Sequence, residues 1–454
     1  MSEPATVSPP SIRANASFLP VATNLVAAFL AGSLFLPLAV NVGGYRYFLP
    51  YHADISVDFS DVARATVLLV ALAVSLTAVR QLGWILSAVG MAIEVFLLYQ
   101  GNDLPQDAVI PILAVAVGLH LGGMLSALAT SDTASRWACA VGLGVGVVAG
   151  RSIYSNILLA ERPDLLSHDG LLMGALTALV LVAGVALLLP GVRAAVPGTG
   201  AANWWGPVVA VVAAAVVGRV LWRVWQGALA DMVRSTLGGT DSRNAMIETL
   251  DQVVGIGIAV VIAVILLVAA YRRGGASLAR WVVVGFALAT TGMALPLNFD
   301  GSVIVDVLVP AAAGTVAAAA MVRWADRWVP ADAVGIALAA GAVLFSSPGN
   351  MEQPASEGAM IALAFAYAFT LTAGLARLTD ARGRGIAGAE VAGAAMLGFA
   401  ALLLAEPVFT PPGFLQVYLY QPVQVSRVLA LAGAAAVLLV LFGFSARVRS
   451  RKQG

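Results

Sequence analysis

The sequence predicts an all-α polytopic membrane protein with about fourteen transmembrane helices. Three observations lead to this prediction. The 454 residues are 60% hydrophobic and only 11% charged, whereas about a quarter of the residues of a soluble domain are charged. Apolar runs close to the length that crosses a bilayer, about 17–25 residues, recur along the whole chain. Arginines gather in alternate connections between these runs, as they do in cytoplasmic loops.

The apolar runs place the spans in order. The first is not expected to be a cleavable signal peptide, because apart from Arg13 no basic segment precedes it and no small-residue cleavage site follows. Several runs are short or glycine-rich. The predicted spans are 18–40, 63–79, 83–100, 108–130, 137–160, 171–190, 204–226, 253–271, 280–297, 303–322, 333–347, 358–378, 388–405 and 426–446.

The charge distribution orients the spans. With the N-terminus in the cytoplasm, most arginines fall in inner segments and most acidic residues in outer loops such as "ERPDLLSHD". The inner group includes Arg280, Arg323, Arg327 and Arg377. Both termini are therefore expected in the cytoplasm, and the protein in the cell inner (plasma) membrane.

Composition also excludes several classes of protein. The single cysteine, Cys139, rules out a disulfide framework and a cysteine-rich metal site. A net charge of +1 argues against a nucleic-acid partner. No nucleotide-binding loop and no hydrolase motif stands in a suitable context. We expect no cofactor, no metal, no nucleotide and no enzymatic activity.

An internal repeat divides the chain. The corner Arg80–Gly83 has a counterpart at Arg272–Gly275, and "RWACAVGLGVG" from Arg136 has one in "RWVPADAVGIALAAG" from Arg327, both at nearly the same offset. The offset covers six spans, so the halves are parallel and two spans remain. The predicted organisation is an N-terminal tail (1–17), a six-helix bundle (18–192), a linker (193–203), a second six-helix bundle (204–380), an additional two-helix hairpin (381–446) and a basic tail (447–454).

Three segments resemble the major facilitator superfamily of transporters. "VNVGGYRYFLPYHADISVDFSD" is similar to that family's passage from span 1 to span 2. "RQLGWILSAVG" is similar to its loop between spans 2 and 3, and the run Gly142–Gly150 resembles the glycine-rich span 5 of its antiporters. A fourteen-span drug:proton antiporter group exists in this family.

The resemblance implies a central cavity lined by spans 1, 4, 7 and 10. This sequence departs from the family pattern in three respects. The loop between spans 2 and 3 lacks the usual aspartate, and the arginine of span 4 is absent, His120 being the nearest polar residue. The fourteen-span group usually carries its extra pair between the halves, whereas the repeat places it at the C-terminus.

Two ionisable residues at membrane depth are candidates for proton coupling. Glu94 lies about 16 Å from the inner face, at 1.5 Å per residue, and His120 enters the next span to a similar depth. Ionisable groups inside a bilayer are rare and tend to serve transport. The alternative is structural: a hydrogen-bonded packing carboxyl and a histidine at a helix interface.

Four further residues are candidates for binding substrate. Arg151 ends the glycine-rich run, and Arg219 and Arg223 share one face of a span at i, i+4. Guanidinium groups facing a cavity would suit an anionic substrate. The alternative for Arg223 is a position at the outer interface, beside Trp222 and Trp225. Asp306, near the outer end of its span, is expected to be solvated or to pair with an arginine.

The polar corners between spans are candidate conformational loops. The residues concerned are Arg80 and Gly83 in the first half and Arg272 and Arg273 in the second. In a major facilitator protein, which the chain resembles, these short cytoplasmic corners connect helices within a bundle.

The predicted function is secondary active transport, with proton-coupled export of a small organic molecule as the specific hypothesis and an anionic substrate as one option. The partners are then a small-molecule substrate, protons and the lipid bilayer. Three alternatives stay open. A flippase for a lipid-linked precursor also suits the arginines, and a polytopic glycosyltransferase could use His52, Asp54, Asp58 or Asp61 of the first outer loop as general base. A non-transporting scaffold is the third.

Overall fold

The computed structural model describes the chain in thirteen stretches: 18–33, 66–74, 82–100, 106–130, 133–159, 184, 205–236, 241–291, 303–326, 328–345, 357–383, 388–409 and 420–453. Within these stretches the regular secondary structure is helical and no strand occurs. The all-α prediction is therefore confirmed.

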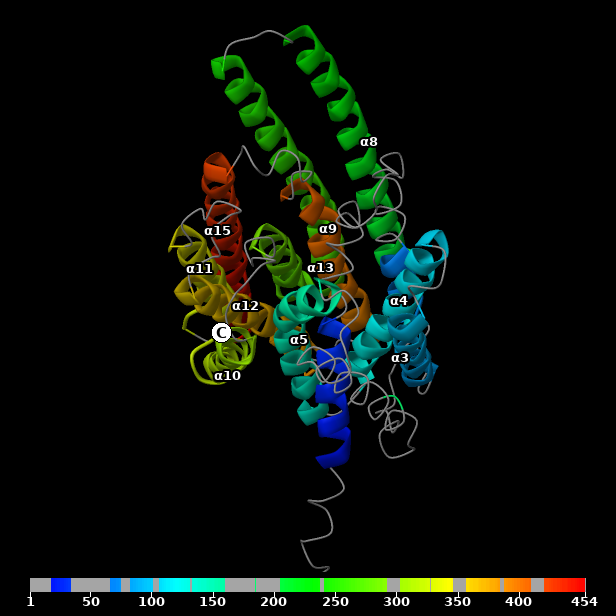
Figure 1. Ribbon diagram of the computed structural model, residues 1–454. Coiled ribbons are helices and arrows are strands. Elements are labelled where there is room, and N and C mark those ends of the chain that lie inside the picture. The colour runs from blue at the N-terminus through cyan, green and yellow to red at the C-terminus, as the bar shows by residue number, and fades with distance from the viewer. Residues whose placement is uncertain are drawn as a thin grey trace, which may run out of the picture.

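The described helices follow the apolar runs closely (Figure 1). Two short helices, 18–33 and 66–74, come first. The others are α3 (Leu82–Gln100), α4 (Gln106–Thr130), α5 (Thr133–Leu159), α8 (Trp205–Thr236), α9 (Asp241–Thr291), the π-helix η4 (Val303–Leu308), α10 (Val309–Trp324), α11 (Ala331–Phe345), α12 (Glu357–Gly383), α13 (Gly388–Phe409) and α15 (Tyr420–Gln453).

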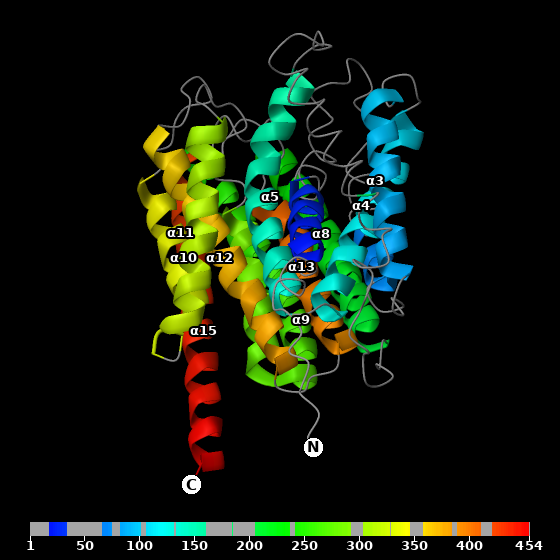
Figure 2. The ribbon, with the colours of Figure 1, turned by 90° about the horizontal axis from the view of Figure 1, so that it is seen from below.

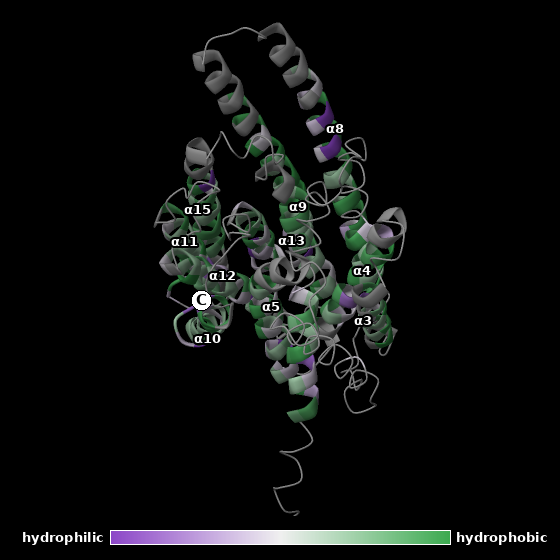
Figure 3. Cartoon of the chain, viewed as in Figure 1, coloured by the Kyte–Doolittle hydropathy of each residue, from purple (hydrophilic) through white to green (hydrophobic). Residues whose placement is uncertain are grey.

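Five of the described helical segments are long and apolar enough to cross a bilayer, which makes this a multi-pass membrane protein. Apolar residues run along them and along the shorter helices (Figure 3). The predicted span 171–190 lies outside the described residues apart from Gly184, so the count of fourteen stays a prediction. The five are Trp205–Trp225, Val253–Thr290, Val305–Trp324, Gly358–Leu378 and Arg427–Phe444.

The corner predicted at Arg272–Gly275 is a sharp bend inside α9. Gly274 has φ −134° and ψ 16°, and Gly275 has φ +64° and ψ −158°. Only glycine adopts the second conformation readily, so this pair lets two spans join without a loop. The other predicted corner is seen only in part: Gly83 lies in the first turn of α3, and Arg80 lies outside the described residues.

The helices form two groups with a shared centre (Figure 2). Helices α3 and α4 pack together on one side, and α10, α11 and α12 pack together on the other. Between them, α5 contacts α10 and α12, and α13 contacts α9 and α4. The residues of α13 from 391 to 403 are all buried, so this helix belongs to the core of the protein.

The helices α8 and the first part of α9 form a hairpin that extends beyond the other helices (Figure 1). Helix α8 packs mainly on α9 and, to a smaller extent, on α13. Their outer faces expose large apolar side chains, among them Val209, Val216, Val260 and Val264. A helix that is apolar on its exposed side is suited to contact with lipid.

Glycines mark several of the closest helix crossings. Gly142 and Gly146 of α5 lie against the backbone of helix 18–33, and Gly398 of α13 lies against Gly285 and Trp281 of α9. Small residues allow helix backbones to approach closely in membranes. Two further crossings join α4 to helix 66–74 through Gly122, and α10 to α12 through Gly314.

Candidate functional site

The candidate site forms where α3 and α4 approach each other most closely. On α3, Ser87, Gly90, Met91 and Glu94 follow the i, i+3/i+4, i+7 spacing of one helix face, and all four are buried. A Cβ atom at Gly90 would lie only 2.5 Å from the Ala116 carbonyl oxygen and 2.9 Å from the His120 backbone nitrogen. The absence of a side chain at Gly90 therefore lets Glu94, one turn later, reach His120.

Glu94 and His120 form a buried pair. The Nδ1 atom of His120 lies 3.3 Å from Glu94 Oε1 and 3.2 Å from Oε2. The two side chains are 1% and 0% exposed. The other ring nitrogen, Nε2, lies 3.1 Å from the carbonyl oxygen of Ala27 in helix 18–33. Three helices thus meet at one imidazole ring.

These partners determine how many protons the pair holds. The Ala27 carbonyl only accepts, so Nε2 must carry a hydrogen and donate it. Nδ1 then either donates to an ionised Glu94 or accepts from a protonated Glu94. In both forms one proton lies between the two groups. If that proton leaves, the lone pair of Nδ1 faces a carboxylate, and the contact becomes repulsive.

A second polar link lies beside the pair on helix 18–33. Asn24, one turn before Ala27, accepts from Cys139 Sγ of α5 at 3.4 Å and donates to the Pro20 carbonyl oxygen at 2.7 Å. Both Asn24 and Cys139 are buried. Helix 18–33 is therefore held by polar contacts to α4 and to α5 at neighbouring turns.

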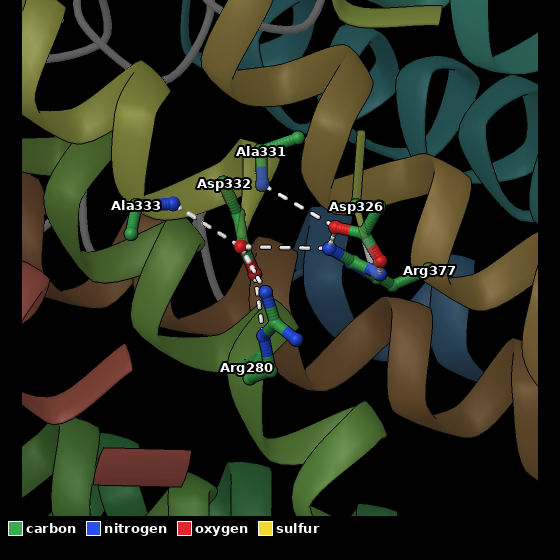
Figure 4. A network of polar contacts seen from close by, with 6 residues as sticks. All are labelled: Arg280, Asp326, Ala331, Asp332, Ala333 and Arg377. Atoms are coloured by element: carbon green, nitrogen blue, oxygen red, sulfur yellow. Dashed lines mark hydrogen bonds and ion pairs between the residues drawn. The ribbon is translucent and has the colours of Figure 1, made fainter. Parts of the chain in front are cut away.

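A second buried charged cluster lies at one end of the second helix group (Figure 4). Arg280 of α9 donates two hydrogen bonds to the Asp332 carboxylate of α11, and the one from Nε measures 2.7 Å. Arg377 of α12 pairs with Asp326, in the turn after α10, and its Nη2 lies 3.8 Å from Asp332 Oδ1. Asp332 also accepts from the Ala333 backbone amide at 3.1 Å.

This cluster joins α9, α11, α12 and the α10–α11 turn, and the guanidinium of Arg280 also lies 5.4 Å from the centre of the Phe442 ring of α15. Our sequence analysis missed it as a site. A usable signal was present, because Arg280 and Arg377 were assigned to the same side of the membrane as the two aspartates of "ADRWVPAD". Bidentate arginine–carboxylate pairs are strong enough to hold helix ends together when water is excluded.

The predicted substrate residues do not gather around the Glu94–His120 pair. Arg219 is half-buried and Arg223 is exposed on α8, which packs against α9 and α13. Neither takes part in the Glu94–His120 contact. Arg151 lies in α5, but its side chain is outside the described residues.

Asp306 differs from the expectation of a solvated helix end. It is only 8% exposed, because η4 continues the helical path before α10 and packs against α5 and α12. Among the predicted corner residues, Arg272 is exposed and Arg273 lies against Gly206 of α8. Among the side chains that the structure describes, no group of three His, Cys, Asp or Glu residues is placed to hold a metal ion.

Comparison with known proteins gives structural neighbours only. No family model and no curated protein matches the sequence. The neighbours include a POT family transporter in complex with 5-aminolevulinic acid (11% identity, 94% of this chain and 96% of that chain, TM-score 0.49). Another is a peptide transporter POT mutant in complex with alafosfalin (14% identity, 94% of this chain and 94% of that chain, TM-score 0.49). A third is a bacterial homologue of the human drug peptide transporters PepT1 and PepT2 (14% identity, 96% of this chain and 98% of that chain, TM-score 0.47).

All three neighbours are therefore transporters, two of them described as POT proteins. Because every one of these TM-scores is below 0.5, the description of this chain rests on its own helices and contacts.

Proposed function

We propose that this protein is a secondary active transporter in which the Glu94–His120 pair couples transport to proton movement. The observation that carries the proposal is the pair itself: a carboxyl and an imidazole, almost completely buried, in contact with each other inside a chain of apolar helices. Ionisable residues at membrane depth that face other helices tend to serve ion or substrate pathways.

The geometry supplies a physical link between protonation and helix position. With one proton held between the two groups, His120 attaches α4 to α3 through Glu94 and to helix 18–33 through Ala27. Loss of that proton would replace an attraction by a repulsion at the α3–α4 contact. A transporter needs such an element, because ion binding must favour one arrangement of helices over another.

The resemblance to the major facilitator superfamily supports the proposal further, with one change in organisation. We place the additional pair of helices at α8 and the first part of α9, between the two bundles. This hairpin extends beyond the other helices (Figure 1) and exposes large apolar side chains, whereas α13, expected in a C-terminal addition, is buried. The glycine crossing of helix 18–33 with α5 then corresponds to that of the second part of α9 with α13.

The substrate in this proposal is a small organic molecule. The anionic alternative depended on arginines that the described structure does not bring to the Glu94–His120 pair. Export across the plasma membrane, with both termini in the cytoplasm, remains our prediction from the glycine-rich α5 and from the arginine distribution.

The test is proton flux in liposomes that contain the purified protein and a trapped pH-sensitive dye. Candidate substrates are added to wild type, Glu94→Gln and His120→Gln. Each single change should abolish substrate-dependent proton flux, and the double variant should be no worse than either, because the two residues act as a unit. Arg323→Gln, which removes an exposed charge from α10, should transport normally.

The outcome also separates the alternatives. Proton flux that survives both single changes would support transport but would show that the Glu94–His120 pair is not needed for proton coupling. If the wild type is folded by size-exclusion chromatography but shows no proton flux with any of a broad set of substrates, the flippase or the glycosyltransferase is favoured. Lipid-linked sugars would then be tested next. The four candidate residues of the first outer loop, His52, Asp54, Asp58 and Asp61, lie outside the described residues.

A further inference from the structure

Asp306 stands apart from the other buried charged residues of the described chain. Glu94 is paired with His120, Arg136 donates to Thr133, and the Arg280, Asp332 and Arg377 side chains form one cluster. Asp306 is 8% exposed. Among the residues that the structure describes, it is the buried charged side chain for which no hydrogen bond or ion pair exists.

Such a carboxylate opposes folding in the absence of a partner. Moving an ion out of water is costly, and the cost is recovered only through an opposite charge or several hydrogen bonds. Asp306 does not supply a contact that holds helices together, so packing does not account for it. It also lies in a six-residue π-helix, Val303–Leu308, and π-helical turns occur often at functional sites.

The position of Asp306 is on a seam between the two groups of helices. The π-helix contacts α5 from the first group and α12 from the second. The buried face runs from Val307 of η4 to Ala311 and Thr315 of α10. There Thr315 and Thr372 of α12 lie against Gly144 of α5.

The seam holds a second polar group without a partner. The Thr372 hydroxyl is buried and, in the described structure, makes no hydrogen bond. At 1.5 Å per residue, Asp306 and Thr315 lie about 13 Å apart along the helix axis, so they stand at two different levels of the helix. The buried Thr372 hydroxyl and the 8% exposed Asp306, neither with a hydrogen-bond partner among the described residues, both lie where the helix Val303–Trp324 meets α5 and α12, which is the arrangement expected where a polar molecule binds.

We propose that Asp306 binds the ammonium group of the transported molecule, at the outer end of this seam. This inference rests on the proposed transport function and narrows its substrate to organic amines. An ammonium group restores the missing counter-charge and donates charge-assisted hydrogen bonds to the carboxylate. A metal ion would need several more oxygen ligands, and the described side chains around Asp306 offer no such group.

The experiment measures binding to the purified full-length protein in detergent, without a proton gradient. The probe is benzylamine, with benzyl alcohol as a neutral molecule of the same shape, at neutral pH in phosphate rather than an amine buffer. Thermal unfolding and titration calorimetry are recorded for wild type, Asp306→Asn, Asp306→Glu and Arg323→Gln. Arg323 lies exposed at the other end of α10.

Benzylamine, and not benzyl alcohol, should raise the unfolding midpoint of the wild type. Asp306→Asn should weaken benzylamine binding on the order of 10- to 100-fold, the loss of a charged hydrogen bond, whereas Asp306→Glu and Arg323→Gln should keep the preference for the amine. Without ligand, Asp306→Asn should unfold at or above the wild-type temperature, because it removes an unpaired charge.

Three results would overturn the proposal. Equal stabilisation by the amine and the alcohol is one, and undiminished amine binding to Asp306→Asn is another. A ligand-free Asp306→Asn that is clearly less stable than wild type is the third, because it would show that the carboxylate has a structural partner. If Asp306→Asn does not fold, the wild-type comparison of amine and alcohol still decides. A failure of the proton-flux test at Glu94 would leave these binding results unaffected.

Discussion

Gly90→Ala should uncouple proton movement from transport while leaving most of the protein folded. A Cβ at this position would lie 2.5 Å from the Ala116 carbonyl oxygen and 2.9 Å from the His120 backbone nitrogen. Both atoms belong to the α4 backbone, which has no rotamer to change. Helix α3 must therefore move away by about 0.9 Å for the closer contact to reach an ordinary 3.4 Å separation.

The same movement acts on the pair one turn away. The contacts of 3.2 and 3.3 Å between Glu94 and His120 would lengthen to about 4 Å, beyond the range of a hydrogen bond. Overpacking costs about 1–3 kcal/mol, and alanine recovers about 0.5–1 kcal/mol of helix propensity. We expect a loss of about 0–2.5 kcal/mol in the free energy of unfolding and a loss of substrate-driven proton flux as large as that of Glu94→Gln.

The assay combines thermal unfolding with dye-reported proton flux in liposomes. Gly257→Ala is the matched control, because a Cβ at that position of α9 meets no atom within 4 Å, and it should retain flux and gain roughly 0.5–1 kcal/mol of stability. Wild-type flux in a folded Gly90→Ala protein would refute the reasoning, since it would show that coupling does not need the close α3–α4 approach.

Two further predictions concern stability. Asp332→Asn should lower the free energy of unfolding by about 3–5 kcal/mol, because buried arginines lose their shared carboxylate; a thermal midpoint equal to that of the wild type would contradict this. Gly146→Ala should sharply reduce the yield of monodisperse protein on size-exclusion chromatography, because the new methyl group falls on the backbone carbonyl oxygen of Phe29. The comparison is Gly341→Ala, which has open space around it and should give a wild-type yield.

The membrane-spanning character was predictable because length and hydropathy are local properties. A run such as 204–226 must form its own backbone hydrogen bonds in a bilayer, so its helical state depends on few other residues. The bend of α9 was predictable for the same reason, since Arg272–Gly275 combines two charges with two glycines. The division of the chain was harder. Short repeats in an alanine-, valine- and glycine-rich sequence also arise by chance, so the predicted division into two bundles and a hairpin stays a prediction.

The candidate site was predictable in its members but not in its geometry. Glu94 and His120 were chosen one at a time, as ionisable residues at similar depth. Nothing in the sequence showed that Gly90 would bring them into contact, or that Ala27 would fix the tautomer of the imidazole. The cluster around Asp332 was missed because its residues lie near helix ends, where a charged residue is ordinarily expected to be solvated.

The sequence by itself determined that this chain is helical and that it crosses a membrane several times. These properties follow from the energy of placing each residue in water or in lipid, which depends mainly on the residue and its near neighbours. The tertiary structure alone decided which charges are paired. Glu94 pairs with His120 and Arg280 pairs with Asp332, whereas Asp306 has no partner among the described residues. Pairing requires atoms on different helices to come within about 3 Å. Small residues at the helix crossings determine how closely the helices pack and so set that distance. It cannot be read from the composition of the apolar runs, because these runs are alike.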